Sequence, residues 1–369
     1  MPIDYIGKTL SNLELIKDGS NTFFKVSDKE SLNSILVEYQ PILDEEYSNT
    51  DFELVLFENN YLNAENDVFQ IFDKLAKIRL GWVFPLSNLE GNENDFYNNE
   101  HLNKYKYVAF QLLLLANEES ITLKDDLEQF NISDIYKDNP IVLILSKENT
   151  SKIPDFSIKN YIPSLSKYGY YKKNEIKNIL NFSQKKTYCL GYRGKVKLNL
   201  YKSQRDIDSD RFFSELFSKH LKSLSHHLIR FHILYQIIEY ILTERFDVVF
   251  NNLIQEFNDG DIVKNDFIEK INELGKERSN IKKVVDCLNE NKTDFDIPNL
   301  ERDCKDLLIA HKKKIRDTLG DLIYDVRNLI VHNYRDIEDE EIEIIENITH
   351  ELELLTINII EKYCPQQCV

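Results

Sequence analysis

The sequence predicts an α+β protein in which a mixed α/β N-terminal domain, residues 1–205, precedes an all-α helical bundle, residues 211–369. Short apolar runs, rich in β-branched and aromatic residues and bounded by Asn, Asp and Gly, recur through the first domain and are typical of strands. From Arg211 onward the apolar residues instead repeat at helical spacing. A chain of 369 residues is long enough for two domains that each bury a core.

The amino-acid composition indicates a globular protein and argues against a membrane-spanning or secreted one. A hydrophobic content of 42% with 11% aromatics indicates a globular chain, and only 10 Gly and 8 Pro argue against long disordered linkers. No apolar run approaches the roughly 18 residues that span a bilayer, and Met1 to Leu10 lacks the regions of a signal peptide. We therefore expect a cytoplasmic protein without a membrane partner. Five irregularly spaced cysteines suit reduced thiols better than a disulfide framework.

The elements of the first domain follow from these patterns. Strands are expected at ELVLF (53–57), residues 107–115, IVLIL (141–145), KTYCLGY (186–192) and KVKLNLY (195–201). The apolar spacing of NDVFQIFDKLAKIRL predicts a helix over 66–80. A tight turn is expected at Tyr192-Arg193-Gly194. The domain boundary is placed near Asp206 to Asp210, where DIDSD offers a helix N-cap.

Charge is distributed unevenly along this acidic chain. The net charge of −17 divides into −15 over residues 1–150, +8 over 151–210 and −10 over 211–369. Within 151–205, thirteen basic residues oppose only Asp155 and Glu175 and are interleaved with tyrosines. Basic and aromatic side chains together suit single-stranded nucleic acid. The candidates for such contacts are Lys172, Lys173 and Arg193. The same segment could instead dock on acidic parts of this protein, or form the solvated face of a small hairpin.

The segment DLIYDVRNLIVHNY, residues 321–334, carries the clearest chemical signal. On a helix Asn328 and His332 share one face, and Arg327 lies at its edge. Arginine grips phosphate oxygens in a planar fork, whereas histidine has an unperturbed pKa near neutrality. Apolar repeats from Ile315 to Val326 and from Ile342 to Leu352 place the motif between two amphipathic helices.

A basic cluster precedes this motif. It comprises Lys312, Lys313, Lys314 and Arg316, which we expect on the helix that leads to Arg327. These side chains would guide phosphates toward Arg327, although consecutive lysines on a helix are also typical of a solvated face. Upstream, the repeat over 211–250 includes LYQIIEYIL, with the polar Glu239 inside it.

A helical C-terminal domain, an Arg-Asn pair with a histidine that completes R-x4-H, and a long closing helix resemble the HEPN superfamily. The likeness covers residues 211–369 at most and is greatest to stand-alone HEPN proteins of bacterial defence, including the Apea-like group, whose early helix reads much like LYQIIEYIL. The resemblance implies a metal-independent endoribonuclease, active on RNA such as tRNA, whose Arg327, Asn328 and His332 meet in a homodimer. It also implies a role in antiphage defence by abortive infection, or as a toxin.

Other interpretations remain open at this stage. Arg327 could pair with Glu239 or Asp325 while His332 caps the carbonyls at the end of its helix. Some HEPN-like domains are non-catalytic modules that bind RNA or nucleotides, or regulate a partner enzyme. No cofactor is expected, because Walker and dinucleotide motifs are absent, and no metal, because the CPQQC tail has no second ligand pair. The acidic N-terminal domain suits a sensor or regulator that contacts a protein trigger or antitoxin.

Overall fold

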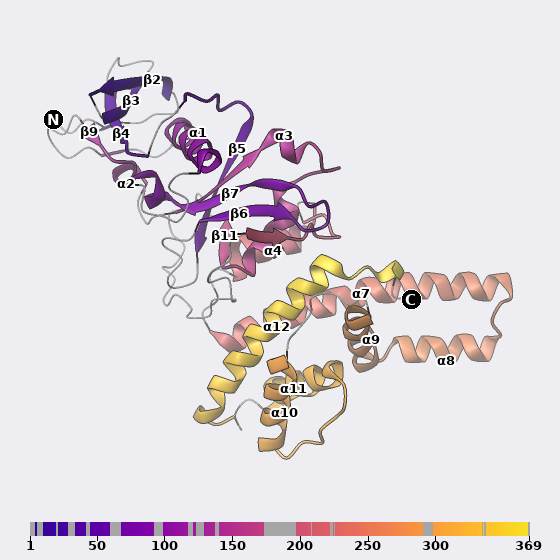
Figure 1. Ribbon diagram of the computed structural model, residues 1–369. Coiled ribbons are helices and arrows are strands. Elements are labelled where there is room, and N and C mark those ends of the chain that lie inside the picture. The colour runs from indigo at the N-terminus through magenta and orange to yellow at the C-terminus, as the bar shows by residue number, and fades with distance from the viewer. Residues whose placement is uncertain are drawn as a thin grey trace. The chain divides into compact units, whose positions relative to one another are not determined.

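The computed structural model describes residues 4–5, 10–19, 21–28, 34–41, 45–59, 68–91, 99–116, 121–122, 129–136, 140–172, 197–207, 209–221, 224, 226–290, 298–333, 335 and 337–367 (Figure 1). Strands occupy much of its N-terminal part and helices its C-terminal part, which confirms the predicted α+β class. The chain divides into two compact units, Met1–Tyr201 and Lys202–Val369.

The N-terminal unit contains sheets of six, four and two strands. The six-stranded sheet has the order β11-β5-β10-β7-β6-β12, formed by Tyr170–Lys172, Phe52–Asn59, Ile141–Ser146, Arg79–Pro85, Phe69–Asp73 and Lys197–Leu200. The four-stranded sheet has the order β2-β3-β4-β9, formed by Leu10–Asp18, Asn21–Asp28, Ser34–Tyr39 and Gln129–Phe130, and β1 (Asp4–Tyr5) pairs with β8 (Ile121–Thr122). Neighbouring strands are antiparallel except in the β6–β12 and β4–β9 pairs.

The six-stranded sheet is buried on both faces, which explains the unbroken apolar run of β10. Val142 and Ile144 belong to a core shared with β3, β4 and helix α1 (Glu100–Ala116), whereas Leu143 and Leu145 belong to a second core with helix α4 (Ile162–Ser166). Figure 1 shows α1 and α4 on opposite sides of this sheet. The short helices η1 (Leu86–Leu89), α2 (Ile132–Ile135), α3 (Lys147–Thr150) and η2 (Ile158–Tyr161) connect the strands.

Two predictions for this unit are wrong. Residues 107–115 lie in helix α1 and not in a strand, because a helix buried on nearly every side between two sheets has the continuous apolar composition of a buried strand. Of the helix predicted over 66–80, the described residues from Val68 onward form strand β6, a turn and the start of β7 instead. The burial of β6 alternates residue by residue, and Leu75, whose spacing favoured a helix, is 67% exposed in the connecting turn.

The remaining strand predictions have mixed outcomes. Strands expected at 53–57, 141–145 and 195–201 are confirmed, in the last case over Lys197–Leu200. The strand expected at 186–192 and the turn at Arg193 lie outside the described residues. The sequence analysis does not predict strands β2, β3 and β4, although β3 supplies Phe24 and β4 supplies Tyr39 to the core.

The described part of the C-terminal unit is helical. Its elements are α5 (Arg211–Glu215), the π-helical turn η3 (Leu216–His220), α7 (His227–Asp259), α8 (Lys264–Leu274), α9 (Glu277–Glu290), α10 (Pro298–Ala310), α11 (Leu319–Asn333), η5 (Asp339–Glu341), α12 (Ile342–Lys362) and η6 (Pro365–Gln367). The predicted N-cap near Asp210 is confirmed, since its carboxylate accepts hydrogen bonds from the N–H groups of Phe212 and Phe213.

A buried ion pair joins the two longest helices. Arg230 of α7 donates to both carboxylate oxygens of Glu353 of α12, at 2.8 and 2.6 Å, and also to the carbonyl oxygen of Leu221. Both side chains are under 10% exposed. Such a bidentate pair fixes the orientation of α7 against α12 because a shift would leave two buried charges without partners.

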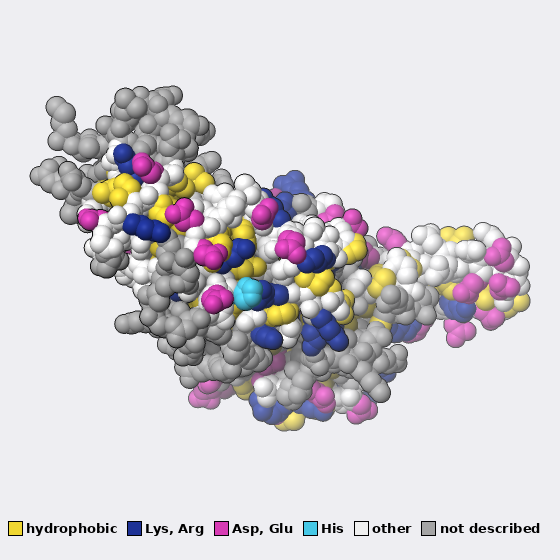
Figure 2. Space-filling model, turned by 45° about the horizontal axis from the view of Figure 1, so that its top comes forward, with side chains coloured by type: hydrophobic (Ala, Val, Ile, Leu, Met, Phe, Trp, Pro, Cys, Tyr) yellow, Lys and Arg dark blue, Asp and Glu magenta, His cyan; other side chains and the backbone are white. Residues whose placement is uncertain are grey.

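The outer half of α7 projects from the bundle together with α8. Gly260 ends α7 in the left-handed conformation, at φ +82°, so that the chain can reverse into α8. Four large apolar side chains remain exposed along this hairpin, namely Phe246, Phe257, Val263 and Ile268. Figure 2 shows hydrophobic and acidic side chains interspersed on the projecting part of the helical unit. The inner half of α7 is therefore the part that belongs to the core.

The cysteines only partly match the expectation of free thiols. Cys304 of α10 is completely buried, and burial raises the pKa of its thiol far above the ordinary range, while Cys364 is free and partly exposed. Cys287 is disulfide-bonded, so the expectation is wrong for that residue. Among the described helices, none has the length and apolar character needed to cross a membrane.

Candidate active site on helix α11

Helix α11 begins at a side-chain cap. The hydroxyl of Thr318 accepts a hydrogen bond from the N–H of Asp321 at 3.3 Å and donates to the Asp321 carboxylate at 2.7 Å. Close by, Gly320 permits tight packing, because a Cβ atom there would lie 2.6 Å from Cα of Lys282 on α9. The cap and the glycine together fix where α11 starts and how near it lies to α9.

One face of α11 is buried and the other carries the motif. The buried face consists of Leu322, Ile323, Val326, Leu329 and Ile330, which the packing of α11 on α9 and α10 covers. Arg327 and Asn328 are partly exposed and His332 is exposed. Because a helix is rigid, burial of the apolar face determines the direction in which these three polar side chains extend.

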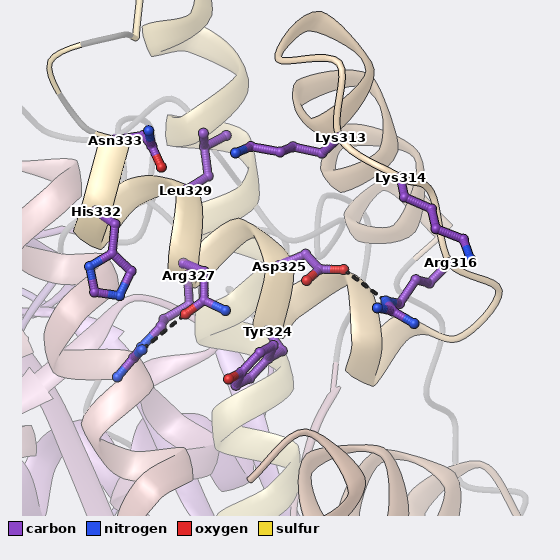
Figure 3. Close-up of a pocket in the computed structure, with 10 residues that line it drawn as sticks. Lys313, Lys314, Arg316, Tyr324, Asp325, Arg327, Leu329, His332 and Asn333 are labelled. Atoms are coloured by element: carbon purple, nitrogen blue, oxygen red, sulfur yellow. Dashed lines mark hydrogen bonds and ion pairs between the residues drawn. The ribbon is translucent and has the colours of Figure 1, made fainter. Parts of the chain in front are cut away.

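Polar side chains line an open pocket of about 480 Å³ (Figure 3). Arg327, Asn328 and His332 line it from α11, and Lys313, Lys314 and Arg316 line it from the connection between α10 and α11. Six of the ten candidate residues chosen from the sequence thus lie around one space. Tyr324, Asp325, Leu329 and Asn333 complete the lining.

The lining of this pocket is strongly basic although the chain is acidic. Four Lys or Arg side chains face one carboxylate, that of Asp325, which gives a net charge of +3 without His332. Asp325 forms ion pairs with Arg316 at 3.3 Å and with Arg278 of α9. Lys313 and Lys314 have no ion-pair partner among the described residues. These two lysines therefore present positive charge that an anion can use.

The guanidinium of Arg327 is held by two helices. It donates to the Asn328 side-chain oxygen at 3.0 Å and approaches a carboxylate oxygen of Glu239 on α7 at 3.4 Å. Its Cζ atom lies 5.3 Å from the ring centroid of Tyr235, one helical turn before Glu239. Burial and then a hydrogen bond to Glu277 raise the pKa of Tyr235, so its ring stays neutral beneath the cation.

His332 differs from Arg327 in having an open environment. It lies in the last turn of α11, its side chain is exposed, and no described residue forms a hydrogen bond or ion pair with it. Figure 3 shows its ring and the Arg327 guanidinium on the same side of α11. Neither side chain is enclosed in the core, so both can reach a ligand in the pocket.

The structure corrects the setting of the basic cluster. Residues 312–316 lie in the connection between α10 and α11, not on a helix, and Lys312 adopts a positive φ of 53°. Lys312 does not line the pocket, in contrast to its neighbours. The four-residue cluster was assigned to a helix because its charge pattern carries no turn signal.

The other candidates lie elsewhere in the chain. Lys172 ends strand β11 in the N-terminal unit, and Lys173 and Arg193 lie outside the described residues. Of the proposed partners of Arg327, Glu239 is in contact with it, while Asp325 pairs with Arg278 and Arg316 instead. Sequence reasoning also missed Tyr324, although its position three residues before Arg327 places it on the same side of a helix.

The described residues contain no group of three His, Cys, Asp or Glu side chains arranged to hold a metal ion. No protein-family model, curated protein or solved structure matches the chain. The resemblance to the HEPN superfamily therefore stays a prediction based on α11 and the helices around it.

Proposed function

We propose that this protein is an endoribonuclease that cleaves RNA without a metal ion, using the pocket on α11. The observation that carries the proposal is the convergence of Arg327, Asn328 and His332 with the basic connection on one open, electropositive space. A fixed cation, an exposed imidazole and lysines that have no ion-pair partner in the described part of the chain suit phosphodiester cleavage.

Arg327 would bind the scissile phosphate and stabilise the extra negative charge of the pentacoordinate transition state. Contacts with Tyr235 and Asn328 support this role, because they orient the guanidinium before substrate arrives. A side chain that is already oriented loses less conformational entropy on binding. To bind there, the phosphate would have to attract the Arg327 guanidinium more strongly than the neighbouring Glu239 carboxylate does.

His332 would transfer protons during the reaction. The ribose 2′-oxygen loses its proton and forms a bond to phosphorus, while the bond from phosphorus to the 5′-oxygen breaks and that oxygen gains a proton. The products are a 2′,3′-cyclic phosphate and a 5′-hydroxyl, and the RNA itself supplies the nucleophile. Asn328 would hold a phosphate oxygen with its amide N–H groups, since its oxygen already accepts from Arg327.

One histidine can either accept the proton of the 2′-OH or donate a proton to the leaving 5′-oxygen. A second group is needed for the other proton transfer. A homodimer in which two copies of α11 face one another supplies it through the partner's imidazole. Because free RNase activity is toxic to a cell, the N-terminal unit would restrain or trigger it, through a protein trigger or antitoxin. Abortive infection or toxin activity in the cytoplasm would then be the biological setting.

The proposal predicts cleavage of RNA, with tRNA and total RNA as first substrates, in the presence of a metal chelator. His332→Ala should lower the rate by about 10²–10⁴-fold through loss of proton transfer, and Arg327→Ala by about 10²–10³-fold through loss of electrostatic stabilisation. DNA should remain intact because it lacks the 2′-OH. Gel electrophoresis with analysis of the product termini measures each effect.

His232→Ala and Arg302→Ala are matched controls, since both side chains are exposed and neither lines the pocket. They should retain the parental rate. Cleavage that continues undiminished in His332→Ala, or that depends on added magnesium, would refute the proposed mechanism.

The contact between Arg327 and Glu239 favours a second candidate, a non-catalytic module that binds RNA or nucleotides or regulates a partner enzyme. A guanidinium already neutralised by a carboxylate can serve folding alone. Purified protein would then bind RNA, or a partner enzyme, without cutting RNA under any condition. Loss of cleavage in Arg327→Ala with unchanged thermal stability would count against this candidate.

A further inference from the structure

Tyr324 has an aromatic surface that neither the motif nor the basic connection uses. The side chain is partly exposed and lines the pocket. Arg278 of α9 covers one face of its ring, with Cζ 4.5 Å from the ring centroid. Since Arg278 does not itself line the pocket, the part of the ring that borders the pocket is the part that Arg278 leaves uncovered.

The ring is held rigidly from behind. Arg278 donates to Asp325 through both terminal nitrogens, in one case at 3.1 Å, and approaches Asp321 at 3.4 Å. Desolvation lowers the pKa of Arg278, but its hydrogen bonds to Asp325 and Asp321 outweigh this and raise it. The cation therefore stays charged and occupied by two carboxylates. Its function toward the pocket is to position Tyr324, not to bind an anion.

Tyr324 also lies between the cations of the pocket. It precedes Arg327 by three residues and Asn328 by four, so it is about one helical turn, roughly 5.4 Å, from them along the axis. Figure 3 shows Arg327 and Arg316 on opposite sides of the ring. A ring flanked by positive charges matches the alternation of bases and phosphates in a nucleic-acid strand.

We propose that Tyr324 stacks an unpaired nucleobase next to the phosphate held by Arg327, so that the pocket takes single-stranded RNA. This inference rests on the proposed function and adds the substrate class. In a duplex each base is already stacked and paired, and turning one out costs a few kcal/mol. Loops and unpaired ends would therefore bind in preference to helical stems.

Binding of a strand that cannot be cut tests this proposal separately from cleavage. A fluorescent 2′-O-methyl oligonucleotide and the same strand with abasic sugars are titrated with the full chain by anisotropy. The variants are Tyr324→Leu, which removes the ring, Tyr324→Phe, which keeps it, and Phe257→Leu as an exposed aromatic control outside the pocket.

Tyr324→Leu should weaken binding of the base-bearing strand by roughly fivefold to a hundredfold, the range for loss of one stacked base. It should leave binding of the abasic strand unchanged. Tyr324→Phe and Phe257→Leu should bind both strands as the parent does. A Tyr324→Leu variant that binds the base-bearing strand normally, or that loses both strands equally, overturns the inference, as does a parent protein that binds neither strand.

The outcome is distinguishable from failure of the proposed function. If the parent binds bases through Tyr324 but cuts no RNA, the stacking role stands and the ribonuclease proposal falls. If the parent cuts RNA and Tyr324→Leu binds and cuts as well as the parent, the ribonuclease stands and the stacking role falls.

Discussion

Arg327 shows how neighbouring side chains can orient a cation before an anion binds. Tyr235 lies beneath its guanidinium, Asn328 accepts one of its N–H groups, and Glu239 approaches from the same helix as Tyr235. Arg327 also lines the pocket, so the N–H groups that these contacts leave unused are available to a ligand there.

The lysines of the connection should contribute charge and not geometry, because they form no described ion pair. Lys313→Ala and Lys314→Ala should each weaken binding of single-stranded RNA and reduce the slope of log affinity against log salt by about 0.7, the value for one neutralised phosphate. Lys312→Gly is the matched control, since Lys312 lies outside the pocket lining and glycine suits its positive φ. Equal effects of all three substitutions would show that the connection acts only as a diffuse field.

At the scale of single residues, helical spacing correctly predicts which polar side chains of α11 lie together. The spacing of Asn328 and His332 placed them on the same side of α11, and both line one pocket. Arg278 could not be predicted, because it reaches the site from α9, 43 residues before Asp321. Contacts between distant segments leave no local pattern in a single sequence.

Helix α11 is the element on which the site depends. Its position is set by the Thr318 cap, by its buried apolar face and by the close approach to α9 at Gly320. The misassigned elements of the N-terminal unit show the opposite situation. Helix α1 and strand β6 both carry apolar residues in patterns that satisfy more than one period, so burial between layers decided their conformation.

Gly320→Ala should therefore disturb both stability and the site. The added methyl group would lie within 3 Å of the Lys282 backbone, and overpacking of this kind costs about 1–3 kcal/mol of unfolding free energy. Chemical denaturation measures the loss, and the RNA cleavage rate should fall with it because α11 must shift away from α9. Gly275→Ala is the control in the same unit, as its nearest contact would be an ordinary 3.7 Å. An unchanged free energy in Gly320→Ala would show that the helices adjust freely.

On the scale of the whole molecule, the net charge of the chain and the charge of the pocket lining have opposite signs. The chain has a net charge of −17, yet Lys and Arg outnumber Asp and Glu by three in the lining of the pocket. Figure 2 shows basic and acidic side chains interspersed on the face that it presents.

We also predict that the whole molecule forms a homodimer. Light scattering at micromolar concentration should give twice the chain mass of 43.7 kDa, and cleavage per chain should fall when the protein is diluted below its dissociation constant, because each site needs the partner's imidazole. Dilution of the His232→Ala variant should follow the parental curve. A monomeric mass together with a constant specific rate at every dilution would contradict the shared site.

The buried thiol of Cys304 allows the opening rate of the helical unit to be measured. The thiol of this α10 residue is buried in the helical unit, and burial raises its pKa and keeps it protonated. Alkylating reagents react with the thiolate, which forms only when the thiol reaches solvent. Modification of that residue, followed by peptide mass spectrometry, can proceed no faster than the bundle opens. The labelling half-life would thus measure how often the helices beneath the pocket open to solvent, and no engineered probe is needed.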